Sequence, residues 1–241
     1  MPVYQIAGLR IQLSPQYQET ISRLEPYLAE GTAYDFSVTL DEERFAVFNS
    51  RSPFPDRPDL NEGPYLYTQI CKRTLSDYDG FFFHSSALEM DGEGYLFTAL
   101  SGTGKSTHTR NWRRLFGDRV TMINDDKPII RKIDGKFYVC GTPWMGKSEI
   151  GCNRIAPVKA IYVLRRGDEN HAEKVSPGTV LKELLEATLL PKTRENMGKL
   201  LNLFNDLFGS VDMFLLTCNK ELDAAQAAYD AAQRTAKEGE A

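Results

Sequence analysis

The chain of 241 residues is 41% hydrophobic and 26% charged, with a formal net charge of −4. That length can bury a hydrophobic core, and the slightly acidic balance weighs against a dedicated nucleic-acid-binding protein, which usually presents a basic face. No stretch approaches the roughly 18 apolar residues that cross a bilayer, and residues 1–10 lack the apolar core of a signal peptide, so we expect a cytoplasmic protein with no membrane or nucleic-acid partner.

Cysteine and histidine are spaced without the pattern of a zinc site. The four cysteines are Cys71, Cys140, Cys152 and Cys218. Because they form no C-x-x-C pair and have no histidine run nearby, we expect buried free thiols in a reducing compartment. Two of the three histidines, His108 on a predicted helix and His171 in a polar stretch, are expected to face the solvent.

Residues 1–63 are predicted to form a small β-rich subdomain that ends in a proline-rich linker. The expected elements are strand structure over residues 3–13, a helix that begins at Ser14-Pro15 and ends near Leu24, and a hairpin with arms at residues 33–40 and 45–48. Four prolines, at positions 53, 55, 58 and 64, indicate a linker or an extended surface segment over residues 51–64.

Residues 64–241 are predicted to form a larger core in which short apolar strands alternate with amphipathic helices. The expected strands cover residues 81–84, 95–100, 120–124, 128–131, 136–140, 160–164 and 211–216, with the first two joined across a turn at 91–94. The expected helices cover residues 65–75, 105–116, 177–190, 196–208 and 222–236. This pattern predicts an α/β protein with a mixed sheet and flanking helices.

A glycine-rich segment between a predicted strand and a predicted helix has the pattern of a phosphate-binding loop. Residues 99–106 match G-x-x-x-x-G-K-[ST], except that Ala99 replaces the first glycine. Such a loop turns several backbone N–H groups toward one anion, and the helix that follows adds the positive end of its dipole. The residues predicted to bind the nucleotide are Ser101, Gly102, Thr103, Gly104, Lys105, Ser106 and Thr107.

Within this loop two side chains have predicted roles of their own. Lys105 is expected to bridge the β- and γ-phosphates of ATP, and the Ser106 hydroxyl is expected to bind Mg²⁺. A glycine-rich turn without a ligand is the alternative explanation. The succession of strand, SGTGKST and helix favours nucleotide binding.

Two consecutive aspartates follow the strand at residues 120–124. Asp125 and Asp126 can divide the work of metal ligand and general base only if the backbone turns there, because neighbours on a straight strand face opposite sides. The following Lys127-Pro128 favours such a turn. The sequence leaves open which aspartate binds the metal and which takes a proton.

With these features in order, the chain resembles the catalytic domain of HPr kinase/phosphorylase and its relatives with the phosphoenolpyruvate carboxykinase-like fold. The matching segments are residues 83–87 (FHSSA), 100–107 (LSGTGKST), 123–126 (INDD) and 141–147 (GTPWMGK). The resemblance covers about residues 81–164 and implies an HPr kinase-like phosphate-loop core. The first 80 residues do not resemble the N-terminal domain of HPr kinases.

The resemblance also implies roles for residues outside the loop. His84 is expected near the γ-phosphate, where it would orient an aspartate or the attacking hydroxyl. A glutamate that reaches the metal in HPr kinases has its nearest candidate in Glu149, although the surrounding motif differs. Lys147 and Arg154 are candidates to place positive charge on the transferred phosphoryl group, with exposed loop charges as the alternative.

Together these observations predict an ATP- and Mg²⁺-dependent kinase that transfers the γ-phosphoryl group to a hydroxyl. The acceptor is the serine of a peptide or small protein, or a small molecule. One alternative is a nucleotide-binding regulatory or assembly protein without efficient turnover, which the alanine at position 99 favours. A pyrophosphate-linked phosphorylase and a homo-oligomeric assembly are further expectations that rest on the resemblance.

Overall fold

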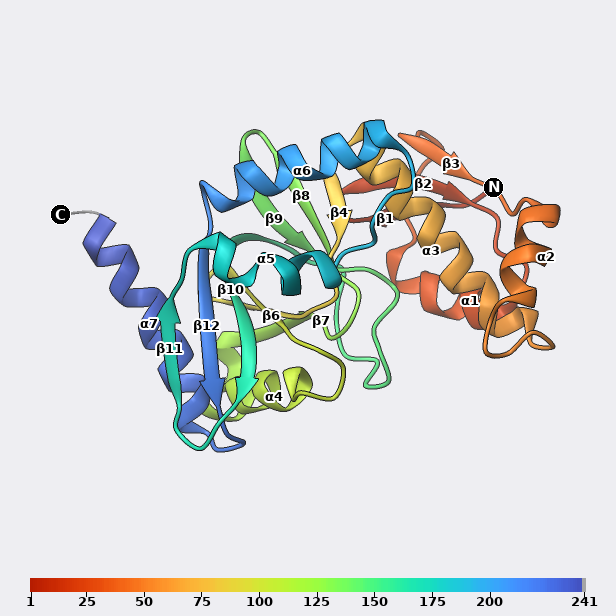
Figure 1. The fold of residues 1–241 in the computed structure, drawn as a ribbon. Coiled ribbons are helices and arrows are strands. Elements are labelled where there is room, and N and C mark those ends of the chain that lie inside the picture. The colour runs from red at the N-terminus through yellow and green to blue at the C-terminus, as the bar shows by residue number, and fades with distance from the viewer. Residues whose placement is uncertain (240–241) are drawn as a thin grey trace.

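The computed structural model describes residues 1–239 and has two sheets (Figure 1). A large mixed sheet of nine strands has helices on both faces, and a three-stranded sheet belongs to the N-terminal part of the chain. The predicted α/β class with a small N-terminal sheet is thus confirmed. None of the helices within residues 1–239 is both long enough and apolar enough to cross a bilayer.

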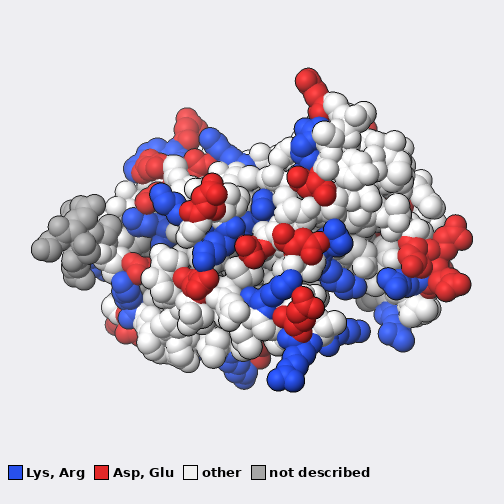
Figure 2. Space-filling model, turned by 90° about the horizontal axis from the view of Figure 1, so that it is seen from above, with Lys and Arg blue, Asp and Glu red and all other residues white. Residues whose placement is uncertain are grey.

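Acidic and basic side chains are intermixed on one face of the protein. Figure 2 shows the face seen from above, on which Lys and Arg lie among Asp and Glu without a broad area of one sign. This distribution agrees with the small net charge of the sequence.

The large sheet is formed by the second, longer part of the chain. Its strands are β4 (Gly80–Phe82), β5 (Ser86–Met90), β6 (Glu93–Thr98), β7 (Val120–Asn124), β8 (Ile129–Ile133), β9 (Lys136–Cys140), β10 (Ile155–Arg166), β11 (His171–Lys174) and β12 (Asp212–Cys218). The order is β4-β8-β9-β10-β6-β5-β7, with β12 beside β10 and β11 beside β12.

Strand β10 joins the two halves of this sheet. Its first residues pair antiparallel with β9, and its later residues run parallel to β6 on one side and to β12 on the other. Strand β5 is antiparallel to both β6 and β7, so β7 runs in the same direction as β6. The carboxyl ends of β6, β7, β10 and β12 therefore lie at one edge of the sheet, which is where α/β proteins place their ligands.

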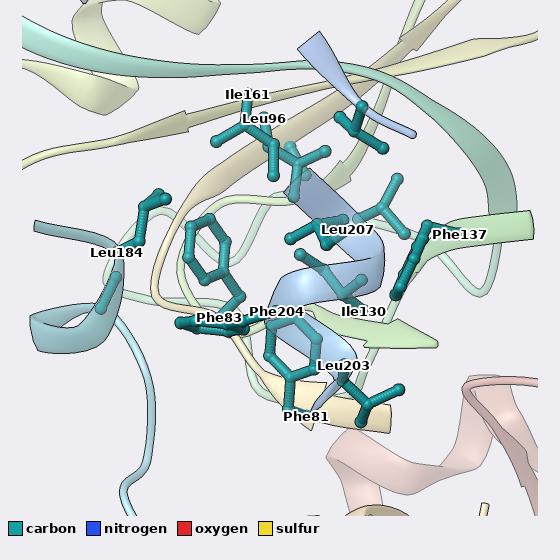
Figure 3. Close-up of a cluster of buried hydrophobic side chains, with 14 of the residues drawn as sticks. Phe81, Phe83, Leu96, Ile130, Phe137, Ile161, Leu184, Leu203, Phe204 and Leu207 are labelled. Carbon is teal, nitrogen blue, oxygen red and sulfur yellow. The ribbon is translucent and has the colours of Figure 1, made fainter. Parts of the chain in front are cut away.

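Each face of the sheet is covered by its own pair of helices. On one face, α5 (Pro177–Glu186) and α6 (Arg194–Phe208) pack against a cluster that includes Phe81, Phe83 and Phe204 (Figure 3). On the other face, α4 (Lys105–Phe116) and α7 (Asp223–Gly239) bury Trp112 and a row of alanines. These alanines allow α7 to approach the sheet closely.

The N-terminal unit contains a small sheet and the helices that cover it. Its elements are β1 (Val3–Ile6), β2 (Leu9–Leu13), α1 (Gln18–Leu24), the 3₁₀ turn η1 (Glu25–Tyr27), β3 (Phe36–Val38), α2 (Glu42–Ser50) and α3 (Pro58–Asp77). One core cluster combines the small sheet with α3 and with Ile129, Cys140 and Trp144 of the larger part. Helix α3 also crosses the domain boundary predicted between residues 63 and 64.

The prediction of a hairpin arm at residues 45–48 is wrong, because these residues belong to α2. The Asp41 side chain accepts a hydrogen bond from the Arg44 N–H at 3.0 Å and caps the helix. Glu42 and Glu43 in the first turn stabilise the helix, because their negative charges lie near the positive end of its dipole. The local cap therefore outweighs the β-propensity of the apolar residues that follow.

The extended segment predicted over residues 51–64 is shorter than expected. Pro58 occupies the start of α3, where a proline costs little because the first N–H groups of a helix have no partner within it. Pro64 lies in the second turn of the same helix. The helix expected to begin near residue 65 thus begins seven positions earlier.

Several strand and helix boundaries also differ from the prediction. Strand β6 forms its hairpin with β5, which was not predicted, while β4 pairs with β8. Strand β11 was also missed, although His171 within it is exposed as expected. Helix α5 ends at Glu186 rather than near residue 190.

Candidate active site

The glycine-rich segment predicted to bind phosphate, for which we keep the name phosphate loop, lies between the end of β6 and the start of α4, at the carboxyl edge of the parallel strands. Gly102 and Gly104 have φ angles of +78° and +130°, which only glycine adopts without strain. The Gly104 carbonyl accepts the first helical hydrogen bond, from the His108 N–H at 2.9 Å. The backbone thus has the strand, left-handed turns and helix start that a phosphate loop requires.

Arg166, at the end of β10, holds this loop from outside, and the sequence analysis missed it. Its guanidinium donates to the carbonyls of Gly102 and Thr103, the latter at 3.2 Å. These contacts give two loop carbonyls a donor and bring a positive charge beside the loop. The position of Arg166 directly after an apolar strand was the available sequence signal.

Lys105 begins α4 and is largely buried, with 8% of its surface exposed. Its Nζ donates to the Ala99 carbonyl at 3.1 Å. Burial lowers the pKa of Lys105, while the charges of Asp126 and Asp125 act in the opposite direction. The lysine is therefore electrostatically coupled to both aspartates.

The turn that separates the two aspartates is held by Asn124, to which the sequence analysis gave no role. The buried Asn124 side chain accepts hydrogen bonds from the N–H groups of Asp126 at 2.9 Å and Lys127 at 2.7 Å. It donates in turn to the Thr142 carbonyl at 3.0 Å. The expected turn is present, and the Asn124 side chain stabilises it.

Asp125 faces the helix of the phosphate loop. The hydroxyls of Ser86 and Ser148 donate to its two carboxylate oxygens, the former at 2.6 Å. Ser86 lies 2.9 Å from the Thr109 hydroxyl, and because the one proton of Ser86 goes to Asp125, Thr109 is the donor in this second bond. A chain of hydroxyl hydrogen bonds thus connects Asp125 to α4.

Asp126 faces away from Asp125 toward His84 and Lys127. Its carboxylate lies 3.0 Å from His84 Nε2 and 2.6 Å from Lys127 Nζ. Burial alone would raise the pKa of Asp126, but the hydrogen bonds from His84 and Lys127 outweigh it and lower the pKa to about 2. Asp126 is therefore ionised at neutral pH.

The other charged candidates lie in different surroundings. Glu149 pairs with Arg23 at 2.7 Å and is largely exposed, so the structure gives its carboxylate a partner in the N-terminal unit. Arg154 pairs with Glu89 at 2.8 Å. Lys147 lines a cleft that also contains Asp126.

His108 is not exposed as expected: only 3% of its surface is accessible. Its Nε2 accepts a hydrogen bond from the Trp112 indole N–H at 3.0 Å, and burial lowers the pKa of His108 to about 3. This histidine is a neutral part of the core beneath the loop. Among the described residues the four cysteines are free thiols, as predicted, and Cys152 is the one that is partly exposed.

The oxygen atoms near the loop suit a magnesium ion. Ser106 in the first turn of α4 and Asp125 supply the hydroxyl and carboxylate oxygens that Mg²⁺ prefers. Within residues 1–239 no group of three His, Cys, Asp or Glu side chains forms a metal cage. That finding is compatible with Mg²⁺, which usually takes one or two carboxylates and completes its shell with water and substrate phosphates.

Three clefts adjoin these residues. Two of them, of about 420 and 560 Å³, flank the phosphate loop and share Gly102, Thr103, Arg165 and Arg166 in their walls. The larger of the two extends to Asn219 and Lys220 beyond β12. The third, which we call the aspartate cleft, has a volume of about 380 Å³ and contains Asp126 and Lys127 on its wall toward the N-terminal unit.

Comparison with known proteins gives a likeness in shape alone. No protein-family model matches the chain, and no curated protein matches it. Among solved structures 47 chains match, including the Hpr(Ser) kinase/phosphatase from Coxiella burnetii, which is 10% identical with a TM-score of 0.40. That alignment covers 66% of this chain and 99% of the other, and a likeness of this size does not bear on the reaction.

Proposed function

We propose that the protein is an ATP- and Mg²⁺-dependent kinase that transfers the γ-phosphoryl group to a hydroxyl acceptor. The observation that carries this proposal is the hydrogen-bonded chain from Thr109 through Ser86 to Asp125. It fixes a carboxylate beside the helix of the phosphate loop, so that a phosphate-binding element and a pair of aspartates share one edge of the sheet.

In this proposal the phosphates lie in the loop, where the backbone N–H groups and the start of α4 favour negative charge. Lys105, already near both aspartates, would leave the Ala99 carbonyl and bind the β- and γ-phosphates. The nucleoside would occupy the larger cleft that flanks the loop, between Arg166 and Asn219.

Ser106 and Asp125 would hold the magnesium ion. When bound, Mg²⁺ neutralises charge on the phosphate oxygens. Ser86 and Ser148 fix the orientation of the Asp125 carboxylate by donating to its oxygens.

Asp126 would orient the acceptor hydroxyl and take its proton. The hydroxyl oxygen forms a bond to the γ-phosphorus while the bond from that phosphorus to the bridging oxygen breaks and ADP leaves. The proton passes from the hydroxyl to Asp126 and then to solvent. His84 holds the Asp126 carboxylate in place. Because the low pKa of Asp126 keeps this carboxylate ionised, it can accept a hydrogen bond from the acceptor hydroxyl.

The test is ATP turnover in the presence of hydroxyl acceptors, with phosphorylated product measured by mass spectrometry. Lys105→Ala and Asp126→Asn are expected to lower the rate by about a hundredfold or more, because phosphoryl transfer depends on positioning and charge stabilisation. The matched control Lys182→Ala alters an exposed lysine on α5 and should leave the rate unchanged. Wild-type rates in both variants would refute the assignment.

A second candidate is a nucleotide-binding protein without efficient turnover. The observation in its favour is that both oxygens of Asp126 are engaged, one by His84 and one by Lys127. Under that alternative, ATP would stabilise the protein against heat equally well in the wild type and in Asp126→Asn, and no acceptor would gain phosphate.

A further inference from the structure

The aspartate cleft continues into a larger groove between the N-terminal helices. This groove, which we call the basic groove, has a volume of about 1070 Å³. It shares Arg23, Leu60, Pro64, Gly146 and Lys147 with the aspartate cleft. A continuous depression therefore runs from Asp126 to the surface of α2 and α3, the part of the chain outside the family resemblance.

The charges around the basic groove are predominantly positive. Its walls carry five cationic side chains, Arg23, Arg44, Arg51, Lys72 and Lys147, and a single acidic one, Glu149. Arg23 is paired with Glu19 and Glu149, and Arg44 lies 3.4 Å from Asp41. In the described part of the chain, the other three have no carboxylate within 4 Å, so the groove has unpaired positive charge in a protein that is acidic overall.

The surroundings of Lys72 support this view. Burial lowers the pKa of Lys72, and the nearby charges of Lys192 and Arg44 lower it further. Cations that repel one another at the rim of a groove would be stabilised by an anionic ligand.

The same groove exposes apolar side chains. Val47, Phe54 and Leu60 are 50%, 58% and 37% exposed, and they line the groove together with Phe48 and the edge of Tyr65. Apolar side chains gathered in a concave surface and rimmed by charge are typical of an interaction site. The ligand chemistry that fits is therefore both acidic and partly apolar.

Nearer to Asp126, the aspartate cleft has two buried polar groups without a partner. Within the described residues, neither the Thr20 hydroxyl nor the Trp144 indole N–H has a hydrogen-bond partner. Both residues are buried, with 1% and 6% of their surface exposed, and both line the cleft. Both lie beside Gly63, where a Cβ atom would stand 3.0 Å from the indole nitrogen. Buried polar groups are nearly always paired, so a ligand in this cleft that displaces the covering side chains would gain two hydrogen bonds.

We infer that the basic groove and the aspartate cleft together bind an acidic peptide segment with apolar side chains, whose hydroxyl is presented to Asp126. The inference rests on the proposed kinase function and names its acceptor class. The acidic side chains would lie against Arg51, Lys72 and Lys147, and the apolar ones against Val47 and Phe54.

The size of the depression favours a peptide over a metabolite. Sites for small molecules usually enclose about 300–1,000 Å³. The basic groove alone lies at the upper end of that range, and the aspartate cleft adds about 380 Å³ in the direction of Asp126. An extended chain fills such a continuous depression, with its hydroxyl side chain in the narrower part.

The test is direct binding of short fluorescent peptides to the full chain, measured by anisotropy. One peptide has a serine among acidic and apolar residues, a second has lysines in place of the acidic residues, and a third has the acidic residues without the apolar ones. We expect the first to bind most tightly. The double variant Arg51→Glu/Lys72→Glu should weaken its binding by about tenfold or more and strengthen binding of the lysine peptide.

The matched control is Lys182→Glu, which reverses an exposed helical lysine far along the chain from this groove. It should leave all three affinities unchanged, and thermal unfolding should show that every variant is folded. Equal affinity for the acidic and lysine peptides, or no effect of the double variant, would overturn the inference. Self-association of the chain through this groove would also overturn the inference. It would appear as a molecular mass in solution that rises with protein concentration.

Binding and turnover separate this inference from the proposed function. If no peptide binds but free serine or glycerol gains phosphate from ATP, the kinase proposal stands and the peptide inference fails. If the acidic peptide binds selectively but ATP is neither bound nor consumed, the groove is a peptide-binding site, and the kinase proposal fails together with the acceptor role of the peptide.

Discussion

On the loop side of the aspartate pair, two serine hydroxyls fix the Asp125 carboxylate, whereas on the N-terminal side exposed apolar and cationic side chains line the basic groove. Asp125 is 8% exposed and accepts from two serine hydroxyls. Across the turn, Phe54 and Lys147 lie open to solvent, and the Thr20 hydroxyl has no partner among the described residues. Under the proposed function, the first region would be preorganised for the reaction and the second would adapt to the acceptor.

The comparison depends most on Asn124, which joins the two regions. Asn124→Ala would leave the N–H groups of Asp126 and Lys127 and the Thr142 carbonyl without their partner. We expect phosphoryl transfer to fall by about a hundredfold, because small displacements of reacting groups cost about that much. The free energy of unfolding should fall by about 1–3 kcal/mol.

Kinetics and denaturant titration measure these effects. Asn153→Ala is the matched control, since Asn153 is exposed and donates to the Gln5 carbonyl away from the aspartates. A variant at Asn124 that keeps wild-type turnover would contradict the view that this turn positions Asp126.

Acid should lower the free energy of unfolding through a buried histidine on the loop side, since the N-terminal unit contains none of the three histidines. His108 has a pKa of about 3 in the folded protein, below its ordinary value of 6.5. As the pH falls from 6.5 toward 3, the unfolded chain binds a proton that the folded chain does not. The free energy of unfolding should therefore fall by about 1.4 kcal/mol per pH unit from this group.

Denaturant titrations between pH 7 and pH 4 would measure this slope. In His108→Gln, the free energy of unfolding should depend less steeply on pH than in the wild type, by the equivalent of about one proton over that range. Parallel curves for the two proteins would show that His108 is not the buried neutral group that its contacts indicate.

A variant at Arg166 would show whether the loop conformation depends on contacts from other segments or on the glycines of the loop alone. Arg166→Ala removes the donors to the Gly102 and Thr103 carbonyls. We expect ATP to bind about tenfold more weakly, since hydrogen bonds to charged groups contribute about 1.5–3 kcal/mol. Calorimetric titration with a non-hydrolysable analogue measures the affinity, with the exposed Arg194→Ala as control. Unchanged affinity would assign the loop conformation to its own sequence.

The smallest expected effect is on the N-terminal side. Thr20→Val keeps the shape of the side chain and removes a buried hydroxyl without a partner. The free protein should be unchanged or more stable by up to about 1 kcal/mol. The apparent KM for an acidic peptide should rise severalfold while kcat is retained. A loss of stability without a change in KM would mean that the hydroxyl serves the fold rather than a ligand.

Much of the larger part of the chain was predictable from local patterns. The strand, loop and helix around residues 99–106 were predicted because glycine at positions 102 and 104 and the helix start at Lys105 are set by neighbouring residues. The turn at Asp134-Gly135 between β8 and β9 depends on the same kind of local signal, and both its residues have positive φ. Such features depend on backbone sterics within a few residues.

Long-range contacts decided the rest. Helix α1 was expected to start with a cap at Ser14-Pro15, yet it begins at Gln18, where the buried Glu62 of α3 accepts from the N–H groups of Gln16 and Tyr17. Arg166 meets Gly102 across 64 positions of sequence.

The sequence by itself determined the glycine-rich loop before a helix, the α/β class and the presence of two aspartates after a strand. The tertiary structure alone decided that Asp125 faces the loop helix and that Asp126 lies on the wall of the aspartate cleft. The physical reason is that the direction of each carboxylate depends on hydroxyl, imidazole and ammonium partners that other segments bring to it, and no local pattern encodes those pairings.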